Sequence, residues 1–499
     1  MKRIVPYIFF AIVSLVGGRE GDAQGITVNL HDSSPPPQDY ALSLAETTRM
    51  ALTYNFDIQL AKYDTWISRT GRMAAESVYD TVIDVLVSYE DDQSARSSTL
   101  LGTKNIENNY NLGISRKLPT GTRVGIDFDN NRSWSDSSFA TINPSHDSSL
   151  SLTVEQELGK NFFGLQDRGR IKVTQKEIEN AEFILLEKIE MSLAEVQKAY
   201  WDLVLQTERV RIEQQMLEHA RELRDNNKEK IRHGLVEEPD LLASEANYKQ
   251  RQNDYQSALD QQRSAEFVLR LLLNFTDLSY QVTAKDPFDT SLGFDEGSQA
   301  LARAFTNRRD YQAIRAMVAA KDIQLTIQQN DMWPQINLKA TMTRNGVDDH
   351  FNQAIEKITH ENNPDLYTEV NVEMPFENHQ SRAELKAAEY DKAKAIVALK
   401  QLERRIMINV LDQVRHCHIA KELAQNAVEI ADLQARKLAA EEKRFQAGRS
   451  NTDTLIRYQD DAVQAQWRAA QAMHRLHVAV VELQKREGSL LDQYWDGAI

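Results

Sequence analysis

Apolar residues recur with helical spacing over residues 165–232, a stretch with no proline and, after Gly169, no glycine. The residues of one seam lie alternately three and four positions apart, which is typical of a helix packed in a coiled coil. They are Ile189, Ser192, Val196, Ala199, Leu203, Gln206, Val210, Glu213, Leu217 and Ala220. At about 1.5 Å of rise per residue, this helix would be roughly 100 Å long, too long to fold back into a compact core.

The end of this helix is predicted as clearly as its body. Lysine and arginine precede Gly234, and Pro239 follows, as in a helix that ends in a glycine turn before a second helix starts. The second helix is expected over 240–274, about half the length of the first. Another half-length helix is predicted to begin at Ser43, with Glu46 completing a capping box. Laid end to end, the two half-length helices have about the same total length as the long helix.

Between the first half-length helix and the long helix, hydrophobic and polar residues alternate in short segments. They predict β-strands over 108–117, 122–131 and 148–156. Residues 80–90 alternate less cleanly but are rich in β-forming residues, and a strand is predicted there too. Strands of about ten residues with one apolar face are expected in a membrane β-barrel. They are equally expected in a soluble antiparallel sheet, so the alternation alone leaves both open.

The second half of the chain repeats the first. After a half-length helix come strands at 334–344 and 366–375, a long helix at 380–447 and a half-length helix at 454–487. Arg444-Phe445-Gln446-Ala447-Gly448 repeats the glycine turn of the first half. The first repeat, 43–275, carries roughly forty residues more between its strands than the second, 298–487. The chain therefore supplies four strands, or six if the 108–131 hairpin joins the same sheet.

The remaining segments are short. Residues 1–23, with Lys2 and Arg3 before an apolar run of about thirteen residues, are predicted to be a signal peptide. Residues 24–42 contain three consecutive prolines and are expected to form an extended tether. Residues 276–297 would be a linker between the repeats and 488–499 a C-terminal tail. No later apolar run reaches eighteen residues, so no transmembrane helix is expected.

Charge and candidate chemistry narrow the functional classes. The formal net charge of -15 and the lack of a binding motif argue against nucleic acid as a partner. No phosphate loop, catalytic elbow or zinc-protease motif is present, so an enzyme is not expected, nor a cofactor. In His416-Cys417-His418 the two imidazoles lie on different helix faces, which disfavours a metal site. His474 and His477 share a face, for which ordinary solvation is the preferred interpretation.

Two further groups have alternative interpretations. The acidic pairs near the turns could form cation-selecting rings in a symmetric assembly, or simply be solvated helix ends. These pairs are Glu237-Glu238 and Asp460-Asp461. Three aromatic residues could belong to a membrane-interface girdle or pack within a barrel. These are Tyr110, Trp134 and Phe139.

One long helix, two half-length helices and a strand pair, all present twice, resemble the TolC-like outer-membrane efflux protein family. The resemblance covers residues 42–487 and is most specific at the two glycine turns and at Trp333-Pro334-Gln335-Ile336. It implies a mainly α-helical fold with a membrane β-barrel: a homotrimer in which each chain gives four strands to one twelve-stranded barrel. A coiled-coil α-barrel would continue it across the periplasm.

The family's function implies a passive export channel that docks on a periplasmic adaptor and an inner-membrane pump of the RND or ABC type. In the family, residues at the helix turns close the periplasmic aperture and bind the adaptor. The matching aperture positions here are Asp240, Phe445, Ser450, Asp453, Thr454 and Arg457. The matching adaptor-docking positions are Arg232, Gly234, Leu235, Val236, Gln446, Gly448 and Arg449.

Two aperture positions depart from the family pattern. Ser450 stands where an arginine is often found, and Arg457 stands where the family has an acid. A rearranged network of Asp240, Asp453 and Arg457 is therefore a hypothesis for the gate. The expected location is the outer membrane, in contact with its lipid, with most of the chain in the periplasm. The alternative is a soluble periplasmic coiled-coil adaptor or scaffold, but such a protein would need one hairpin rather than two.

Overall fold

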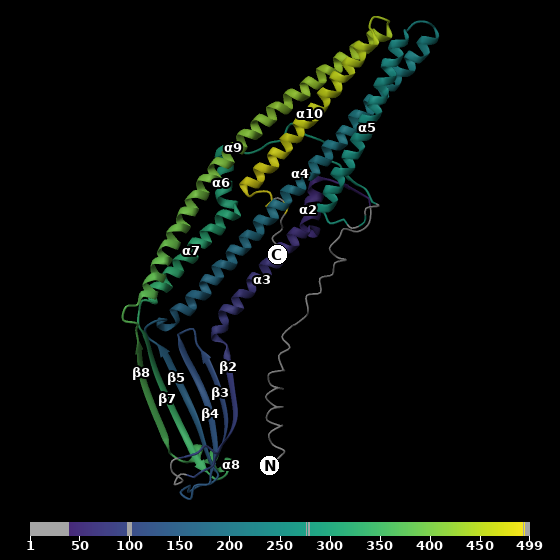
Figure 1. Ribbon diagram of the computed structural model, residues 1–499. Coiled ribbons are helices and arrows are strands. Elements are labelled where there is room, and N and C mark those ends of the chain that lie inside the picture. Colours follow the sequence, from purple (N-terminus) through teal and green to yellow (C-terminus); the bar gives the residue numbers. More distant parts are fainter. Residues whose placement is uncertain (1–38, 97–101, 276, 278–279, 493, 495–499) are drawn as a thin grey trace. The chain divides into compact units, whose positions relative to one another are not determined.

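The computed structural model describes residues 39–96, 102–275, 277, 280–492 and 494 (Figure 1). The predicted signal peptide and most of the predicted tether lie outside these residues. The chain divides into two compact units, which are described separately. The first comprises Met1–Phe56 and Ala199–Pro287, and the second comprises Asp57–Lys198 and Phe288–Ile499. Among the described residues, no helix has both the length and the apolar character needed to cross a membrane.

The first unit combines a helical hairpin with a small parallel strand pair. Its elements are β1 (Tyr40–Leu42), α2 (Leu44–Tyr54), the C-terminal half of α4 (Leu165–Arg232), α5 (Glu238–Leu272) and β6 (Val282–Ala284). β1 pairs in parallel with β6. The buried Tyr200 hydroxyl lies 3.1 Å from the Leu42 carbonyl oxygen and 3.0 Å from Asp286 Oδ2. That carboxylate accepts the Leu44 amide at 2.7 Å.

This strand pair corrects two sequence-based expectations. The sequence places residues 40–42 in the extended tether 24–42, and residues 282–284 in the linker 276–297. They form instead a packed strand pair against Tyr200, and burial raises the pKa of its hydroxyl, which therefore stays a neutral donor. The tyrosine satisfies polar backbone groups at a point where the two strands are too short to do so alone.

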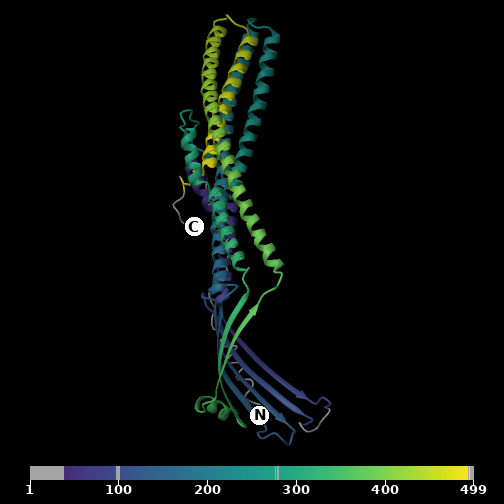
Figure 2. The same ribbon diagram turned by 90° about the vertical axis from the view of Figure 1, so that its left-hand side faces the viewer.

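The second unit contains a six-stranded antiparallel sheet, whose strands run along one another in Figure 2. Its order is β2-β3-β4-β5-β7-β8. The strands are β2 (Thr81–Asp92), β3 (Asn105–Lys117), β4 (Thr122–Ser135), β5 (Ser145–Glu157), β7 (Gln335–Asp348) and β8 (Pro364–Glu373). The 108–131 hairpin, β3 and β4, lies inside this sheet between β2 and β5. The four strands per chain that the resemblance implied are therefore six among the described residues.

The register separates the sheet into an apolar and a polar face. One row of directly paired residues is apolar on all six strands: Ile83, Ile114, Ile126, Leu152, Met342 and Leu366. Each of these side chains is between 44% and 71% exposed. The adjacent row, which points to the other face, contains only polar residues and glycine: Asp84, Gly113, Asp127, Ser151, Thr343 and Asp365. This change of face between neighbouring residues follows from the two-residue period of a strand.

Helices of the second unit continue from the sheet. α3 (Phe56–Glu76) and α7 (Arg309–Asn330) lead into strands through η2 (Ser77–Tyr79) and Trp333-Pro334, and α4 follows β5 through η3 (Phe162–Gly164). α9 (His379–Gln446) follows β8, and α10 (Thr452–Glu487) and α6 (Gly297–Asn307) pack against it. The helical core between them centres on small and branched side chains. It includes Ala300, Ala304, Ile406, Val410, Cys417, Leu476 and Leu483.

The predicted half-length helices that precede the strands are interrupted in both repeats, which corrects the expectation of continuous helices. Asn55 separates α2 from α3, and Arg308 separates α6 from α7. Both residues leave the helical conformation, with ψ of 127° at Asn55 and 123° at Arg308. The Asn55 side-chain amide donates to the Leu272 carbonyl at 2.8 Å, while the Arg308 guanidinium contacts the Asp310 carboxylate and the Arg486 carbonyl. The Leu272 and Arg486 carbonyls are distant in sequence, so local helix propensity does not reveal these two interruptions.

Two further features differ from the sequence-based expectations. A helix not predicted from the sequence, α8 (Phe351–His360), packs against the apolar face at β5 and β7. Gly346 makes room for it, because a Cβ there would lie 2.3 Å from the Ala354 carbonyl oxygen. The segment expected as a tail from 488 is partly packed: Leu490 and Leu491 are buried, and the Leu491 amide lies 3.4 Å from Glu190 Oε1.

Candidate functional site

The turn between α4 and α5 is closed by glycine. Gly234 has φ of 65°, the Leu235 amide donates to the Lys230 carbonyl at 3.0 Å, and the Gly234 amide donates to the Ile231 carbonyl at 3.1 Å. This pair of bonds is a Schellman motif, which uses the left-handed glycine to satisfy the last helical carbonyls. Leu235 is 73% exposed at the turn. Of the predicted docking positions, Arg232, Gly234 and Leu235 are thus not buried, and Val236 is half-buried.

The turn between α9 and α10 repeats this geometry. Gly448 has φ of 71°, and the Arg449 amide donates to the Arg444 carbonyl at 2.8 Å. The Gly448 amide donates to the Phe445 carbonyl at 3.1 Å. Asn451 then caps α10, since its side-chain oxygen accepts the Thr454 amide at 2.9 Å. Gln446, Gly448 and Arg449 are exposed, as a docking surface requires.

A buried carboxylate that was not predicted stabilises this second turn. Glu441 is 4% exposed, accepts a hydrogen bond from the Ser450 hydroxyl and forms an ion pair with Arg444 at 3.2 Å. Ser450, expected at the aperture, is thus engaged within its own hairpin. Glu441 lies three residues after the buried Leu438, at the spacing of the helix seam. A charged residue on an apolar seam is the sequence signal that could have identified it.

The other predicted aperture residues are distributed over both units. On the second hairpin, Asp453 is exposed in the first turn of α10, Thr454 is half-buried, and the Arg457 guanidinium lies 5.7 Å from the centre of the Tyr458 ring. Phe445 is half-buried. On the first hairpin, Asp240 is half-buried, and its carbonyl oxygen accepts from the Asn227 side chain at 3.3 Å. The proposed contact of Asp240 with Asp453 and Arg457 stays a prediction.

We expect Gly448→Val to destabilise the α9–α10 turn by about 1–2 kcal/mol, the cost of a left-handed conformation for a residue with a Cβ. No atom lies within 4 Å of the position of an added Cβ, so the penalty is one of backbone conformation alone. Gly448→Asn should cost less, because asparagine tolerates this conformation. Hydrogen exchange at the Arg449 amide, which donates to the Arg444 carbonyl in this turn, would measure the difference. Equal exchange in the two variants would contradict the prediction.

The acidic pairs near the turns occupy different environments. Glu237 is exposed immediately before α5, whereas Asp461 forms an ion pair with Lys437 at 2.9 Å. Tyr110 and Trp134 lie on strands β3 and β4 at positions of the apolar face, and Phe139 is 68% exposed in the following loop. Placement on this face favours the girdle interpretation for Tyr110 and Trp134. The cation-selecting role of the acidic pairs stays a prediction.

The histidine and cysteine motifs are structural. Cys417 is buried with its thiol 3.3 Å from the Ala479 carbonyl oxygen, and burial raises the pKa of the thiol to about 12. The two histidines beside Cys417 contact different residues. His416 pairs with Asp412 at 3.3 Å, and the ring of His418 packs on that of Phe294. The solvated interpretation of His477 is wrong. It is 3% exposed, and its Nε2 accepts the Asp289 amide at 3.0 Å.

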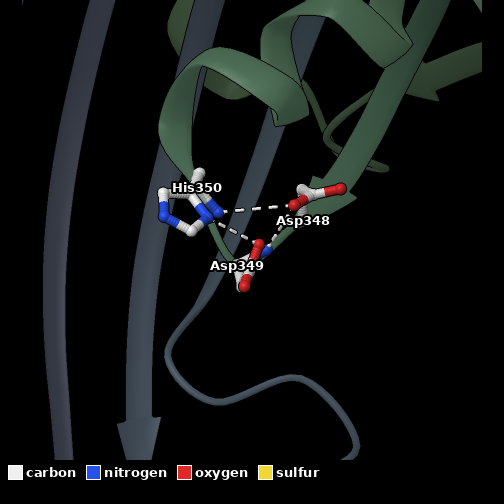
Figure 3. Close-up of side chains that lie close together, drawn as sticks. All are labelled: Asp348, Asp349 and His350. Atoms are coloured by element: carbon white, nitrogen blue, oxygen red, sulfur yellow. Dashed lines mark hydrogen bonds and ion pairs between the residues drawn. The ribbon is translucent and has the colours of Figure 1, made fainter.

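Asp348, Asp349 and His350 gather at the start of α8 (Figure 3), with candidate metal-ligand atoms within 4.8 Å of one another. The contacts explain the cluster without an ion. Asp348 accepts the Asp349 amide at 2.8 Å and pairs with Lys357 at 2.8 Å, while His350 Nδ1 lies 2.7 Å from Asp349. These bonds hold the turn that starts α8 and leave the carboxylate of Asp348 neutralised by an ammonium group.

Comparison with known proteins finds one family model that matches part of the chain. Residues 300–489 match the family model described as outer membrane efflux protein. No curated protein matches the sequence.

The chain is similar in fold to solved outer-membrane proteins. For the Campylobacter jejuni CmeC outer membrane channel, the TM-score is 0.62 at 14% identity, covering 89% of this chain and 85% of that one. For the Neisseria gonorrhoeae MtrE outer membrane channel the TM-score is 0.66 at 15% identity, covering 90% and 89%. For the Vibrio cholerae outer membrane protein VceC it is 0.64 at 12% identity, covering 89% and 96%. The family match over residues 300–489 and the shared fold over about nine tenths of the chain together confirm the resemblance to the outer membrane efflux protein family.

Proposed function

We propose that three copies of this chain form an outer-membrane channel, the exit duct of a tripartite efflux pump or type I secretion system. The duct is a passive conduit from the periplasm to the cell exterior. Most of each chain lies in the periplasm, where a periplasmic adaptor and an inner-membrane pump of the RND or ABC type are the proposed partners. The proposed function includes no catalytic step, since passage through a channel is passive.

The observation that carries this proposal is the two-faced sheet. A row of six large apolar side chains, each between 44% and 71% exposed, crosses all six strands, and the neighbouring row contains only polar residues and glycine. A soluble protein rarely leaves a continuous apolar face of this kind uncovered. In a barrel, the apolar face would meet lipid and the polar face would line an aqueous lumen.

The edges of the second unit support assembly from several copies. β2 and β8 each pair on one side only, and unpaired strand edges cannot face lipid. The helices that adjoin these edge strands also expose large apolar side chains. On α3 these are Leu60, Ile67 and Met73, and on α9 they are Val397, Ile408 and Leu423, between 56% and 69% exposed. Neighbouring copies would cover both the strand edges and the helix faces.

A soluble periplasmic adaptor or scaffold remains the competing proposal, and the same sheet argues against it. An adaptor would have to bury the exposed apolar row against another part of itself. Among the described residues only α8 packs on this face, and it covers β5 and β7 near the ends of those strands. The long helices alone would suit either function, so the exposed apolar row of the sheet is what favours the channel.

The polar face also predicts ion preference. Acids outnumber bases on it. The acids include Asp84, Glu90, Glu107, Asp127, Asp129, Glu155, Glu369 and Glu373, and the bases are Lys117, Arg123 and Lys339. Carboxylates that line a narrow aqueous path raise the local concentration of cations. The channel should therefore prefer cations.

The gate proposal leads to a conductance measurement. The signal-cleaved protein should be nearly closed and cation-preferring in planar bilayers. Changing Asp240 and Asp453 together to alanine should raise its mean conductance about threefold or more, because two of the carboxylates proposed to hold the aperture are lost.

Glu237→Ala is the matched control, since it removes an exposed acid near the first turn that the gate proposal does not use. If the parent conducts and the double variant matches it, the gate lies elsewhere while the channel stands. If neither protein inserts nor conducts, the channel proposal fails and the soluble alternative takes its place.

A further inference from the structure

We infer that the copies of this chain close an eighteen-stranded barrel, which admits solutes too bulky for the twelve-stranded barrel that the family resemblance implied. The inference rests on the proposed trimeric channel and specifies the size class of its cargo. Three copies of a six-stranded sheet give eighteen strands. The extra strands are the β3–β4 hairpin, which could either take part in the wall or lie outside it.

The hairpin is a full part of the wall. β3 pairs with β2 over twelve residue pairs and with β4 over thirteen, and β4 pairs with β5 over twelve. The apolar row continues through it without a break, from Ile83 through Ile114 and Ile126 to Leu152. A hairpin folded outside the barrel would not keep its apolar residues in register with both neighbouring strands.

The helices next to the sheet leave room for six strands. α3, α4, α7 and α9 lie side by side there: Arg69 pairs with Glu182, the Cβ position of Gly169 meets Ile327, and Lys392 pairs with Asp322. Four helices at 8–10 Å spacing span roughly 36 Å. A strand tilted by about 40° occupies about 6 Å of circumference, so six strands span roughly 38 Å and four only roughly 25 Å.

Strand directions also permit closure. β2 follows α3 and β8 leads into α9, so the two edge strands run in opposite directions relative to the helices. β8 of one copy can therefore pair with β2 of the next in the antiparallel sense that all other pairs of this sheet use. The result is a ring of even strand number with no edge exposed to lipid.

The added strands change the width of the lumen. At about 6 Å of circumference per strand, twelve strands give a backbone radius of about 12 Å and eighteen about 18 Å. Subtracting about 5 Å for the inner side chains leaves a lumen radius of roughly 7 Å or 13 Å. The cross-section thus differs about threefold. The cargo class that fits only the wider lumen is a hydrated polymer or folded segment about 20 Å across.

Polymer exclusion in planar bilayers tests the width on the full-length protein. The full-length protein and the deletion below both carry Asp240→Ala and Asp453→Ala in this test, because a nearly closed aperture would otherwise limit the current and hide the width of the barrel. Polyethylene glycol is added on the barrel side. Polymers with a hydrodynamic radius of about 10 Å should lower the conductance if the lumen has a radius near 13 Å. They should have no effect on a lumen near 7 Å.

A deletion provides the matched comparison. Glu90, Glu107, Ser133 and Ser145 lie in one row of paired residues, so replacing residues 91–144 by Asn-Gly places Glu90 opposite Ser145 across a two-residue turn. β2 and β5 then become antiparallel neighbours with the same face outward. We expect the deletion to stay trimeric by native mass spectrometry and to lose about two-thirds of the conductance, with exclusion of the 10 Å polymer.

The outcomes separate the inference from the proposed function. Eighteen strands are supported if the full-length protein is a conducting trimer that admits the 10 Å polymer and the deletion variant excludes that polymer. A conducting trimer that excludes the polymer overturns the inference and leaves the channel intact. A conducting dimer also overturns it, since two six-stranded sheets close only twelve strands. A chain that never conducts overturns both. If the deletion variant does not fold, polymer exclusion and the mass of the full-length protein still decide.

Discussion

A Leu152→Arg chain should fail to insert into outer-membrane lipid, whereas a Ser151→Arg chain should insert normally. The two residues are neighbours on β5 but belong to opposite faces. Leu152 is 46% exposed in the row where all six strands carry large apolar residues. An arginine on the lipid face of a barrel costs about 2–4 kcal/mol at the midplane, and the proposed trimer would incur this cost three times. Ser151 instead faces the polar side, where its hydroxyl lies 2.9 Å from that of Thr343.

The measurement is the fraction of each variant that becomes protease-resistant and heat-modifiable after refolding with lipid vesicles. In the Ser151→Arg variant the new guanidinium would enter a lumen already rich in carboxylates, so its expected effect is confined to a weaker cation preference. The pair controls for side-chain size and charge, because the two variants introduce the same residue type one position apart. Equal insertion of both would show that this sheet does not face lipid, and the soluble alternative would follow.

Much of this fold could be predicted from the sequence because its signals are local and long. The seam of α4 repeats over about nine turns, from Ile189 to Ala220, and a few adjacent residues are enough to identify each glycine turn. The strand predictions agree with the structure to within a few residues, because apolar and polar side chains alternate along most of the strands and the segment 80–90 is rich in β-forming residues. Because the second half of the chain repeats the first, the position of one helical hairpin also predicts the position of the other. Errors in any one position matter little when a pattern continues for so many residues.

The parts that were missed depend on distant contacts. β1 and β6 have three residues each and form only because they meet one another and Tyr200 across the sequence. The interruptions at Asn55 and Arg308 need partners more than 170 residues away. At the candidate site, the glycine turns were predicted while Glu441 was not, because its role appears only when Ser450 returns to it from the far side of the turn. Side-chain partners of this kind leave no periodic signal.

Two buried groups of the second unit should give it opposing responses to pH. His477 accepts the Asp289 amide as a neutral ring, and burial lowers its pKa from 6.5 to about 4. The unfolded chain binds the extra proton between these values, so stability falls as the pH drops from about 6.5 through 4. A shift of this size corresponds to a loss on the order of 3 kcal/mol. His477→Gln should remove this loss, since the glutamine oxygen can accept the same amide without titrating.

Glu190 has the opposite sign. It is 5% exposed, and burial raises its pKa from 4.5 to about 7. The folded chain binds the proton more tightly here, so stability is full below pH 4.5 and is lost as the pH rises through 7, again on the order of 3 kcal/mol. Between pH 4.5 and 6.5 the two slopes oppose each other. Glu190→Gln should therefore make the protein more stable than the parent at pH 8 and leave it unchanged near pH 4.

Denaturant midpoints followed by helical circular dichroism at pH 4, 6 and 8 would separate the two groups. Relative to the parent, His477→Gln should gain stability only at the acidic end, and Glu190→Gln only at the alkaline end. The remaining titratable groups are common to all three proteins and cancel in these differences. The double variant should show both gains, because the two residues bond to different segments, 289 and 491. If both single variants instead follow the parent at every pH, neither residue titrates with the shifted pKa that its burial implies.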